Sequence, residues 1–217
     1  MSRRFQRPFA VAAATGALLL VAVLSVRPTR EAVFRGLGHL LVVDDTLQAS
    51  DTIVLPEWAG RAGALEAADL VHNGLSKRVA VLAEIHGAAD RELDRRGVPF
   101  QNGAAQLASL LGALHVIDVE TIPNAVTGTE AEGELLPIWC DQHRFDSIIV
   151  ISSPDHSRRL RRVLHRSMQG HNTRVFVRFT HYSAFDADTW WQSRDGTRTA
   201  IVELEKLVLD VVRHPMS

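Results

Sequence analysis

The chain has 217 residues, 46% of them hydrophobic, and a formal net charge of −1. This length suits one domain with a buried core, and the balanced charge excludes the global positive field that draws a protein onto nucleic acid, so we expect no nucleic acid partner. Because Cys140 is the single cysteine, an intramolecular disulfide and a multi-cysteine metal site are excluded, and we assign no metal ligands.

The amino-terminal segment is the most apolar part of the chain. Residues 9–26 carry no charge and are flanked by arginines on both sides. As a helix rising about 1.5 Å per residue they would span roughly 27 Å, close to the thickness of the bilayer's hydrocarbon core. A cleavable signal peptide has a shorter apolar region, and residues 23–25 make a poor cleavage site. We therefore expect residues 1–27 to be an uncleaved signal anchor that crosses the lipid bilayer.

The side of the membrane on which the domain lies follows less directly. The flanking arginines are balanced, so the positive-inside rule does not decide the orientation. The tail before the span is very short, and the folded domain follows this first span. We therefore expect a single-pass protein of the cell membrane with its domain on the extracytoplasmic side.

The rest of the chain has the pattern of an α/β domain. Residues 28–49 are interpreted as a juxtamembrane helix and connector, and residues 50–214 as the folded domain. Short β-branched runs alternate there with longer amphipathic ones, which is typical of a mostly parallel sheet flanked by helices. Their near-continuous apolar character suits strands buried on both faces. The predicted strands are 52–55, 78–83, 116–120, 147–151 and 173–179.

Three helices can be assigned between and after these strands. Residues 61–73 have helical spacing and stop at Gly74. A second helix is expected to start at Thr129, where Thr129 and Glu132 match a capping box. The last helix is predicted over residues 200–213, with a core stripe of Leu204, Leu207, Val208 and Val211.

A fourth helix follows the run "IIVISSPDHSRR" and is rich in arginine. Ser153 is a favourable N-cap and Pro154 suits the first helical position, so the helix is expected to begin there. Its core face consists of Leu160, Val163, Leu164 and Met168. At 100° per residue, Arg158, Arg162 and His165 fall on the opposite face and are predicted to be solvated.

His156 and Arg159 occupy different positions on this helix. His156 falls within about 40° of the core face, and Arg159 lies on its flank, from which a guanidinium can reach over the strand ends. A helix start, Ser152 and Ser153, an imidazole and a bidentate donor together form a site for phosphate or carboxylate. The imidazole also suits acid–base chemistry. The alternative is structural: His156 hydrogen-bonds the chain and Arg159 pairs with a carboxylate.

In parallel sheets ligands bind outside the carboxyl ends of the strands, which selects further candidate residues. Glu57 with Trp58, Glu84 with His86, and Glu120 are expected at those ends. Such carboxylates and imidazoles can bind metal or move protons. Glutamates are also common at exposed strand ends, so Glu57 and Glu84 are more simply read as solvated.

The order of these motifs resembles the DUF218 family, also described as YdcF-like or SanA/ElyC-like proteins. The resemblance covers roughly residues 50–212 and rests on "SDTIVLP", "RAGALEAADLVHNG", "VETIPNAVTGTEAEGELL", "IIVISSPDHSRR", "WW" and "ELEKL". It implies a Rossmann-like α/β domain, often tethered to a bacterial membrane by one amino-terminal helix and implicated in envelope biogenesis or barrier function.

The motif positions of this family can be placed on the chain. They fall on Arg61, Glu120, Thr129, Ser152, His156 and Arg159, with Glu203 and Lys206 near the end. The last two have a plain alternative as a surface pair. Thr127 competes with Thr129 for the family threonine, and Thr129 is chosen for its capping box. Relatives have a glycine-rich turn after the first strand where this chain has "LPEWAG", so Trp58 is expected to narrow or repurpose the pocket.

Two functions follow from this resemblance and the residues. In the first, an envelope protein binds and processes a phosphate-bearing, lipid-linked intermediate, with Arg61 and Arg159 as clamps, His156 as acid–base and Glu120 orienting it. In the second, a non-catalytic module senses an anionic, nucleotide-like ligand or scaffolds envelope proteins. No cofactor is assigned. Hydrogen bonding between His156 and Glu120 favours the first function, and a pocket blocked by Trp58 favours the second.

Overall fold

The structure of the chain is a computed structural model that describes residues 25–85, 87–98 and 103–216. The predicted anchor lies almost entirely outside these residues, and within them no helix is both long and apolar enough to cross a membrane. The elements in chain order are α2 (Arg27–Leu41), β1 (Thr52–Pro56), η1 (Glu57–Ala59), α3 (Gly60–His72), β2 (Arg78–Glu84), α4 (Ala88–Arg95), α5 (Gly103–Ala113), β3 (Asp118–Val126), α6 (Thr129–His143), β4 (Ser147–Ser152), α7 (Pro154–Ser167), β5 (Arg174–Phe179), η2 (Trp190–Gln192) and α8 (Arg194–Arg213).

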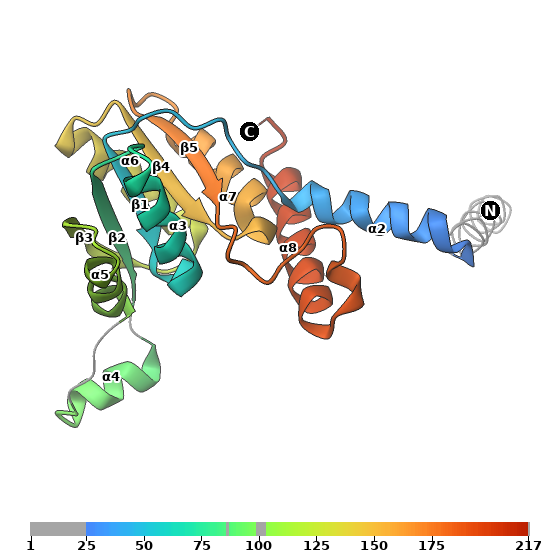
Figure 1. Ribbon diagram of the computed structural model, residues 1–217, viewed down its shortest axis with the longest axis horizontal. Helices are drawn as coiled ribbons and strands as arrows, with labels where there is room; N and C mark the ends of the chain where they lie inside the picture. Colours follow the sequence, from blue (N-terminus) through green and yellow to red (C-terminus); the bar gives the residue numbers. More distant parts are fainter. Residues whose placement is uncertain (1–24, 86, 99–102, 217) are drawn as a thin grey trace, which may run out of the picture.

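The centre of the molecule is a parallel sheet of β1 to β5 in the order β3-β2-β1-β4-β5 (Figure 1). Successive side chains of a strand point to opposite faces. Ile53 therefore packs under α3 and α5, whereas Val54 packs under α6 and α7. Helices cover both faces, which explains why the central strands β1 and β4 are buried along their whole length. The predicted mostly parallel, Rossmann-like α/β fold is confirmed.

β3 departs most from its predicted range of 116–120. It begins two residues later and continues through Pro123 to Val126. Proline cannot donate to a ladder, so it is tolerated only at sheet edges or bulges. β3 is the edge strand, and its pairing with β2 shifts register between Leu82 and Glu84, where Pro123 and its neighbours are accommodated.

The helix predicted over residues 61–73 is α3, and Gly74 follows its end with a φ of 76°, which suits glycine. α7 begins at Pro154 as predicted, with Ser153 extended at the N-cap position although its side chain makes no capping bond. α4 and α5 are additional helices that were not predicted.

α8 starts six residues earlier than predicted. The face that it buries also differs from the predicted core stripe. Ser193 caps it by accepting a hydrogen bond from the backbone N–H of Gly196 at 3.0 Å. Val208 and Val211, assigned to the core, are 59% and 42% exposed. The face that is buried carries Ala200, Glu203, Leu207 and Asp210. Two carboxylates therefore lie where the pattern of apolar residues predicted solvent.

These carboxylates face α7, and this corrects the prediction that Arg158 and Arg162 are solvated. Arg162 Nε donates to Asp210 Oδ2 at 2.6 Å and its NH2 group to the carbonyl of His214. Arg158 donates to the carbonyls of His39 and Val42, at the end of α2. α2 and α8 cover this side of α7, so the two arginines join elements instead of facing water. His165 is exposed, as predicted.

Candidate functional site

A pocket of about 260 Å³ opens at the carboxyl end of the sheet. Its walls come from the segments that follow β1, β3 and β4, and from α8. The lining residues are Trp58, Gly128, Thr129, Glu132, Ser153, Asp155, His156, Arg159, Glu203 and Lys206. In the order β3-β2-β1-β4-β5, chain direction across the sheet reverses between β1 and β4, where open α/β sheets bind ligands.

His156 lies in the first turn of α7 and is only 7% exposed. Its Nδ1 is 3.1 Å from Glu203 Oε2 and 2.9 Å from the NH2 group of Arg159, and its Nε2 is 3.3 Å from Thr129 Oγ1. Burial lowers the pKa of His156 against the opposing hydrogen bond with Glu203, which favours the neutral imidazole. The burial that the helical period predicted is confirmed.

Arg159 reaches across from the next turn of the same helix. Its Nε donates to Glu203 Oε2 at 3.0 Å and its NH1 group to Thr129 Oγ1 at 3.0 Å. With the contact to His156, these use three of the five N–H groups that a guanidinium carries. Arg159 lines the pocket, and its two remaining N–H groups can bind a ligand.

Glu203 is the carboxylate that orients this cluster, and it is not the exposed residue that the alternative of a surface pair with Lys206 required. It is buried, and its Oε1 also accepts a hydrogen bond from Lys206 Nζ at 2.7 Å. Burial by itself would raise the pKa of Glu203, but the hydrogen bonds from His156, Lys206 and Arg159 outweigh it and hold the pKa well below its usual range. Glu203 is thus ionised and fully engaged.

Trp58 forms the wall opposite His156, in the turn where relatives in the resembled family carry glycines. Its ring meets the imidazole edge-on, with the ring centroids 4.8 Å apart. Its Nε1 donates to Glu132 Oε1 at 2.6 Å. Glu132 therefore does not form the predicted capping box: α6 begins at Thr129 after the N-cap residue Gly128, and Thr129 turns its hydroxyl toward His156 and Arg159.

Glu132 was predicted to take part in a capping box but lines the pocket instead. It is 3% exposed, and its Oε2 is buried without a hydrogen-bond partner among the described residues. Burial raises the pKa of Glu132 against the lowering effect of Trp58, and burial likewise raises the pKa of Asp155 against a hydrogen bond from Ser153. In its neutral form a carboxyl group donates a hydrogen bond, so Glu132 can face an anion.

Two helix starts converge on this pocket. Gly128 and Thr129 open α6, and Ser153 with Asp155 opens α7. The first turn of a helix leaves backbone N–H groups without intrahelical partners, and its dipole places partial positive charge there. Together with Arg159 and Lys206 they bring hydrogen-bond donors suited to phosphate or carboxylate to a pocket that also holds the carboxyl groups of Glu132, Asp155 and Glu203.

Other predicted site residues lie elsewhere. Glu120 is in the middle of the edge strand β3, with β2 and β1 between it and β4. Arg61 is exposed near the start of α3 and does not line the pocket. Ser152 is fully buried and its hydroxyl donates to the carbonyl of Ser153, which does line the pocket. The sequence therefore predicted Thr129 on α6 and the part of the site on α7, and it pointed to Glu203 through the family resemblance alone.

The carboxylates expected at the neighbouring strand ends form a separate group. Glu57 accepts a hydrogen bond from the backbone N–H of Glu84 at 2.9 Å. Burial, and then the charge of Glu57, raise the pKa of Glu84. This pairing is a structural connection between η1 and β2.

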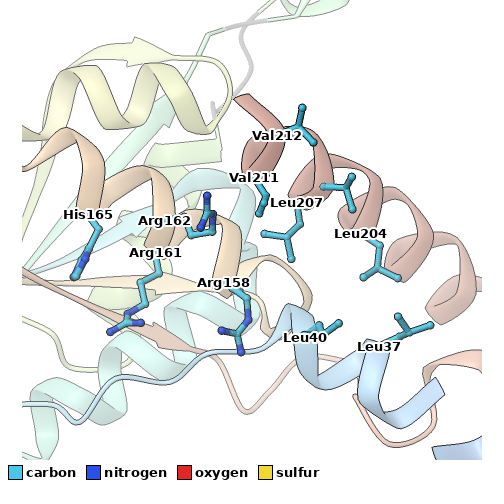
Figure 2. Close-up of a pocket in the computed structure, with 11 residues that line it drawn as sticks. Leu37, Leu40, Arg158, Arg161, Arg162, His165, Leu204, Leu207, Val211 and Val212 are labelled. Atoms are coloured by element: carbon cyan, nitrogen blue, oxygen red, sulfur yellow. The ribbon is translucent and has the colours of Figure 1, made fainter. Parts of the chain in front are cut away.

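A second and larger hollow of about 590 Å³ lies between α2, α7 and α8 (Figure 2). Leu37 and Leu40 on α2 face Leu204 and Leu207 on α8 across it, next to the arginines of α7. The exposed valines of α8 complete its wall. Arg161 and Arg162 beside it are paired with Asp45 and Asp210. The groove is an apolar surface and offers little free charge.

One cluster of the described residues has the spacing of a metal site: Glu130, Asp210 and His214. Arg166 pairs with both carboxylates, and Arg162 also contacts Asp210. The two guanidinium groups supply the positive charge that a cation would bring. We interpret the cluster as an ion-pair network between α6, α7 and α8.

Comparisons with known proteins give only distant similarities. The sequence matches no family model and no curated protein. The chain is similar to a universal stress protein in complex with cAMP, at 14% identity and a TM-score of 0.38, over 63% of this chain and 100% of that one. It is also similar to the reductase domain of an aureusimine biosynthetic cluster, at 16% identity and a TM-score of 0.33, over 85% of this chain and 51% of that one.

A third solved structure is HcgE from Methanothermobacter marburgensis, bound to guanylylpyridinol and ATP. It shares 14% identity over 80% of this chain and 100% of that one, with a TM-score of 0.29. Similarities at these scores do not indicate which ligand this chain binds. Its function is inferred from the pocket alone.

Proposed function

We propose that the pocket around His156 binds a small anionic group, most simply the phosphate of a larger envelope intermediate. The observation that carries this proposal is the convergence of two helix starts with the free N–H groups of Arg159 at the point where the sheet order reverses. The bound group is small, because Trp58 narrows the side of the pocket that follows β1.

A non-catalytic sensor or scaffold is the second candidate. Trp58 against His156 favours it, as does the distance between Glu120 and the imidazole in the fold. Glu120 was predicted to orient His156. Glu203 can orient it instead, because it contacts Nδ1 of His156. Both candidate functions involve an anion in the pocket. The proposal of anion binding therefore does not depend on whether the protein catalyses a reaction.

Calorimetric titration of the full-length chain with inorganic phosphate tests the binding proposal. Hydrogen bonds to charged groups contribute about 1.5–3 kcal/mol, so Arg159→Ala should weaken phosphate binding roughly 10- to 150-fold. Arg213→Ala is the matched control, because Arg213 is an exposed residue of α8 outside the pocket. Equal affinity of the parent and Arg159→Ala, or no heat of binding in the parent, would refute the proposal.

We also propose that the chain is a DUF218 protein held in the cell membrane by residues 9–26, with its domain on the extracytoplasmic side and a role in envelope biogenesis. The uncharged run and the order of the family motifs support this proposal. The full-length protein should stay with the membrane fraction after alkaline washing. Its release into the supernatant would contradict the anchor, and activity of a cytoplasm-only reporter fused after Ser217 would contradict the orientation.

A further inference from the structure

Three side chains of the pocket are arranged as a hydroxyl–imidazole–carboxylate series. Thr129 Oγ1 is 3.3 Å from His156 Nε2, and His156 Nδ1 is 3.1 Å from Glu203 Oε2. Serine and threonine nucleophiles are activated by this arrangement, in which the carboxylate orients the imidazole and the imidazole removes the hydroxyl proton. The distance between Thr129 and His156 is slightly long, as is common in the absence of substrate.

Thr129 also lies where neighbouring groups can stabilise its oxygen as a nucleophile. It is the first residue of α6, it lines the pocket, and its Oγ1 accepts a hydrogen bond from the NH1 group of Arg159 at 3.0 Å. A positive group at this oxygen stabilises its deprotonated form. The free N–H groups of the first helical turn lie beside it and can stabilise negative charge on a substrate.

Arg159 links this arrangement to the presence of an anion. Its NH2 group is 2.9 Å from Nδ1 of His156, a contact that is a hydrogen bond only while Nδ1 carries no proton and that then excludes the hydrogen bond from Nδ1 to Glu203. An anion in the pocket draws guanidinium N–H groups toward itself. Nδ1 can then carry the proton and donate to Glu203, which leaves Nε2 free to accept the proton of the Thr129 hydroxyl.

We infer that Thr129 is the nucleophile of a phosphate-ester hydrolase, with His156 as its base and Glu203 as the residue that positions the imidazole. This inference rests on the proposed phosphate-binding function of the same pocket. In the first step the Oγ–P bond forms, the bond from phosphorus to the ester oxygen breaks, and the hydroxyl proton moves to His156 Nε2. The ester oxygen leaves with the electron pair and takes the proton from His156. When the leaving group departs as an anion, His156 gives that proton to solvent before the second step.

In the second step water completes the hydrolysis. Its oxygen attacks the phosphorus of phosphothreonine and gives a proton to His156 Nε2. The bond between phosphorus and Oγ breaks, and Oγ recovers its proton. The products are one alcohol and inorganic phosphate from one ester and one water, so no further reactant is required.

Hydrolysis of 4-nitrophenyl phosphate by the full-length chain tests this inference. Nitrophenolate leaves without a proton, so the assay reports mainly on the nucleophile and its base. Removing a catalytic nucleophile typically costs about 10³-fold or more in turnover, so Thr129→Val should lose at least that much, while Thr129→Ser retains a hydroxyl and should rescue turnover. Acid quenching during turnover should reveal phosphate on the peptide that contains Thr129.

Phosphate calorimetry on the same variants separates this inference from the proposed function. The hydroxyl of Thr129 makes at most one hydrogen bond to the charged phosphate, so Thr129→Val should weaken binding by no more than about 150-fold, less than the expected loss of turnover. A parent chain that binds phosphate through Arg159 but does not hydrolyse the ester overturns the inference and leaves the proposed function intact. Turnover unchanged in Thr129→Val also overturns it, as does lost turnover without phosphothreonine, which assigns Thr129 a positioning role.

Discussion

At the scale of single residues, Glu203 determines how the candidate site is built. It receives hydrogen bonds from His156, Arg159 and Lys206 while buried between α7 and α8. Removing one partner of a buried, hydrogen-bonded charge leaves the other charges uncompensated. The same carboxylate therefore contributes to stability and sets the orientation of the imidazole.

We predict that Glu203→Gln lowers the free energy of unfolding at pH 7 by about 3–5 kcal/mol, the usual cost of breaking a buried ion pair. The pKa of Glu203 is lower in the folded state than its ordinary value of 4.5, so its stabilisation is complete above about pH 4.5 and is lost as the pH falls below it. Thermal unfolding between pH 3 and 7 should show a steeper acid loss for the parent than for the variant.

The exposed Glu205 on the same helix provides the control for this prediction. Glu205→Gln should change the free energy of unfolding by less than about 0.5 kcal/mol, as is usual for surface sites. His156 adds to the acid loss in both proteins, because its lowered pKa makes protonation more favourable in the unfolded chain below about pH 6.5. Equal stability of Glu203→Gln and the parent at pH 7 would argue against the buried network.

The sequence predicted the position of a side chain correctly where the period of one helix determines it. It did not do so where the position depends on how two helices pack together. The period of α7 correctly placed His156 toward the core and Arg159 on its flank. Glu203 carries the cluster from α8, 44 residues after Arg159, and its burial depends on how α8 is rotated against α7. A family motif pointed to Glu203, but the local pattern E-x-x-K favoured a surface pair.

At the scale of elements, α7 shows why a helical wheel does not identify solvent. Its face opposite the sheet is covered by α2 and α8, and its arginines bind their carbonyl and carboxylate groups. A wheel separates the apolar face from the polar face, but it does not say whether other elements cover the polar face. The five strands were predicted because sheet burial gives each strand its own apolar run. α4 buries no residue, and the helical spacing of Ala104, Leu107 and Leu111 in α5 was not recognised.

We predict that Arg162→Gln destabilises the folded state by about 1.5–3 kcal/mol, the range for hydrogen bonds to charged groups. Its partner Asp210 is buried and, among the residues that the structure describes, would keep the longer contact with Arg166. His165→Gln on the same helix is the control, because His165 is exposed. A thermal midpoint for Arg162→Gln that matches the control would show that α8 does not depend on this pair.

At the scale of the whole molecule, α2 projects from the α/β body and is held at its base by the segment before α8 (Figure 1). Trp190 Nε1 donates to the carbonyl of Phe34 at 2.8 Å, and both rings pack together. Gly38 permits this contact, because a Cβ there would meet the carbonyl oxygen of Ala187 and lie 2.8 Å from Trp190 Cδ1. α2 begins at Arg27, where the predicted membrane span ends, so this contact holds the segment that follows the span against the domain.

Two glycines of α2 give a matched pair of substitutions. Gly38→Ala should destabilise the protein by about 1–3 kcal/mol, because the added methyl group overpacks the contact with Ala187 and Trp190. Gly36→Ala meets nothing within 4 Å and should stabilise the protein by up to about 1 kcal/mol through helix propensity. Thermal unfolding of both variants measures the difference, and equal midpoints would indicate that α2 is not docked through Gly38.

The central claim is that the pocket around His156 and Arg159 holds a small anion, and mass spectrometry of the molecules that co-purify with the full-length chain tests it most directly. The parent should release a phosphate- or carboxylate-bearing molecule that is absent from Arg159→Ala and present in the control Arg213→Ala. A parent that releases no such molecule, or an identical set from the parent and Arg159→Ala, would contradict the claim.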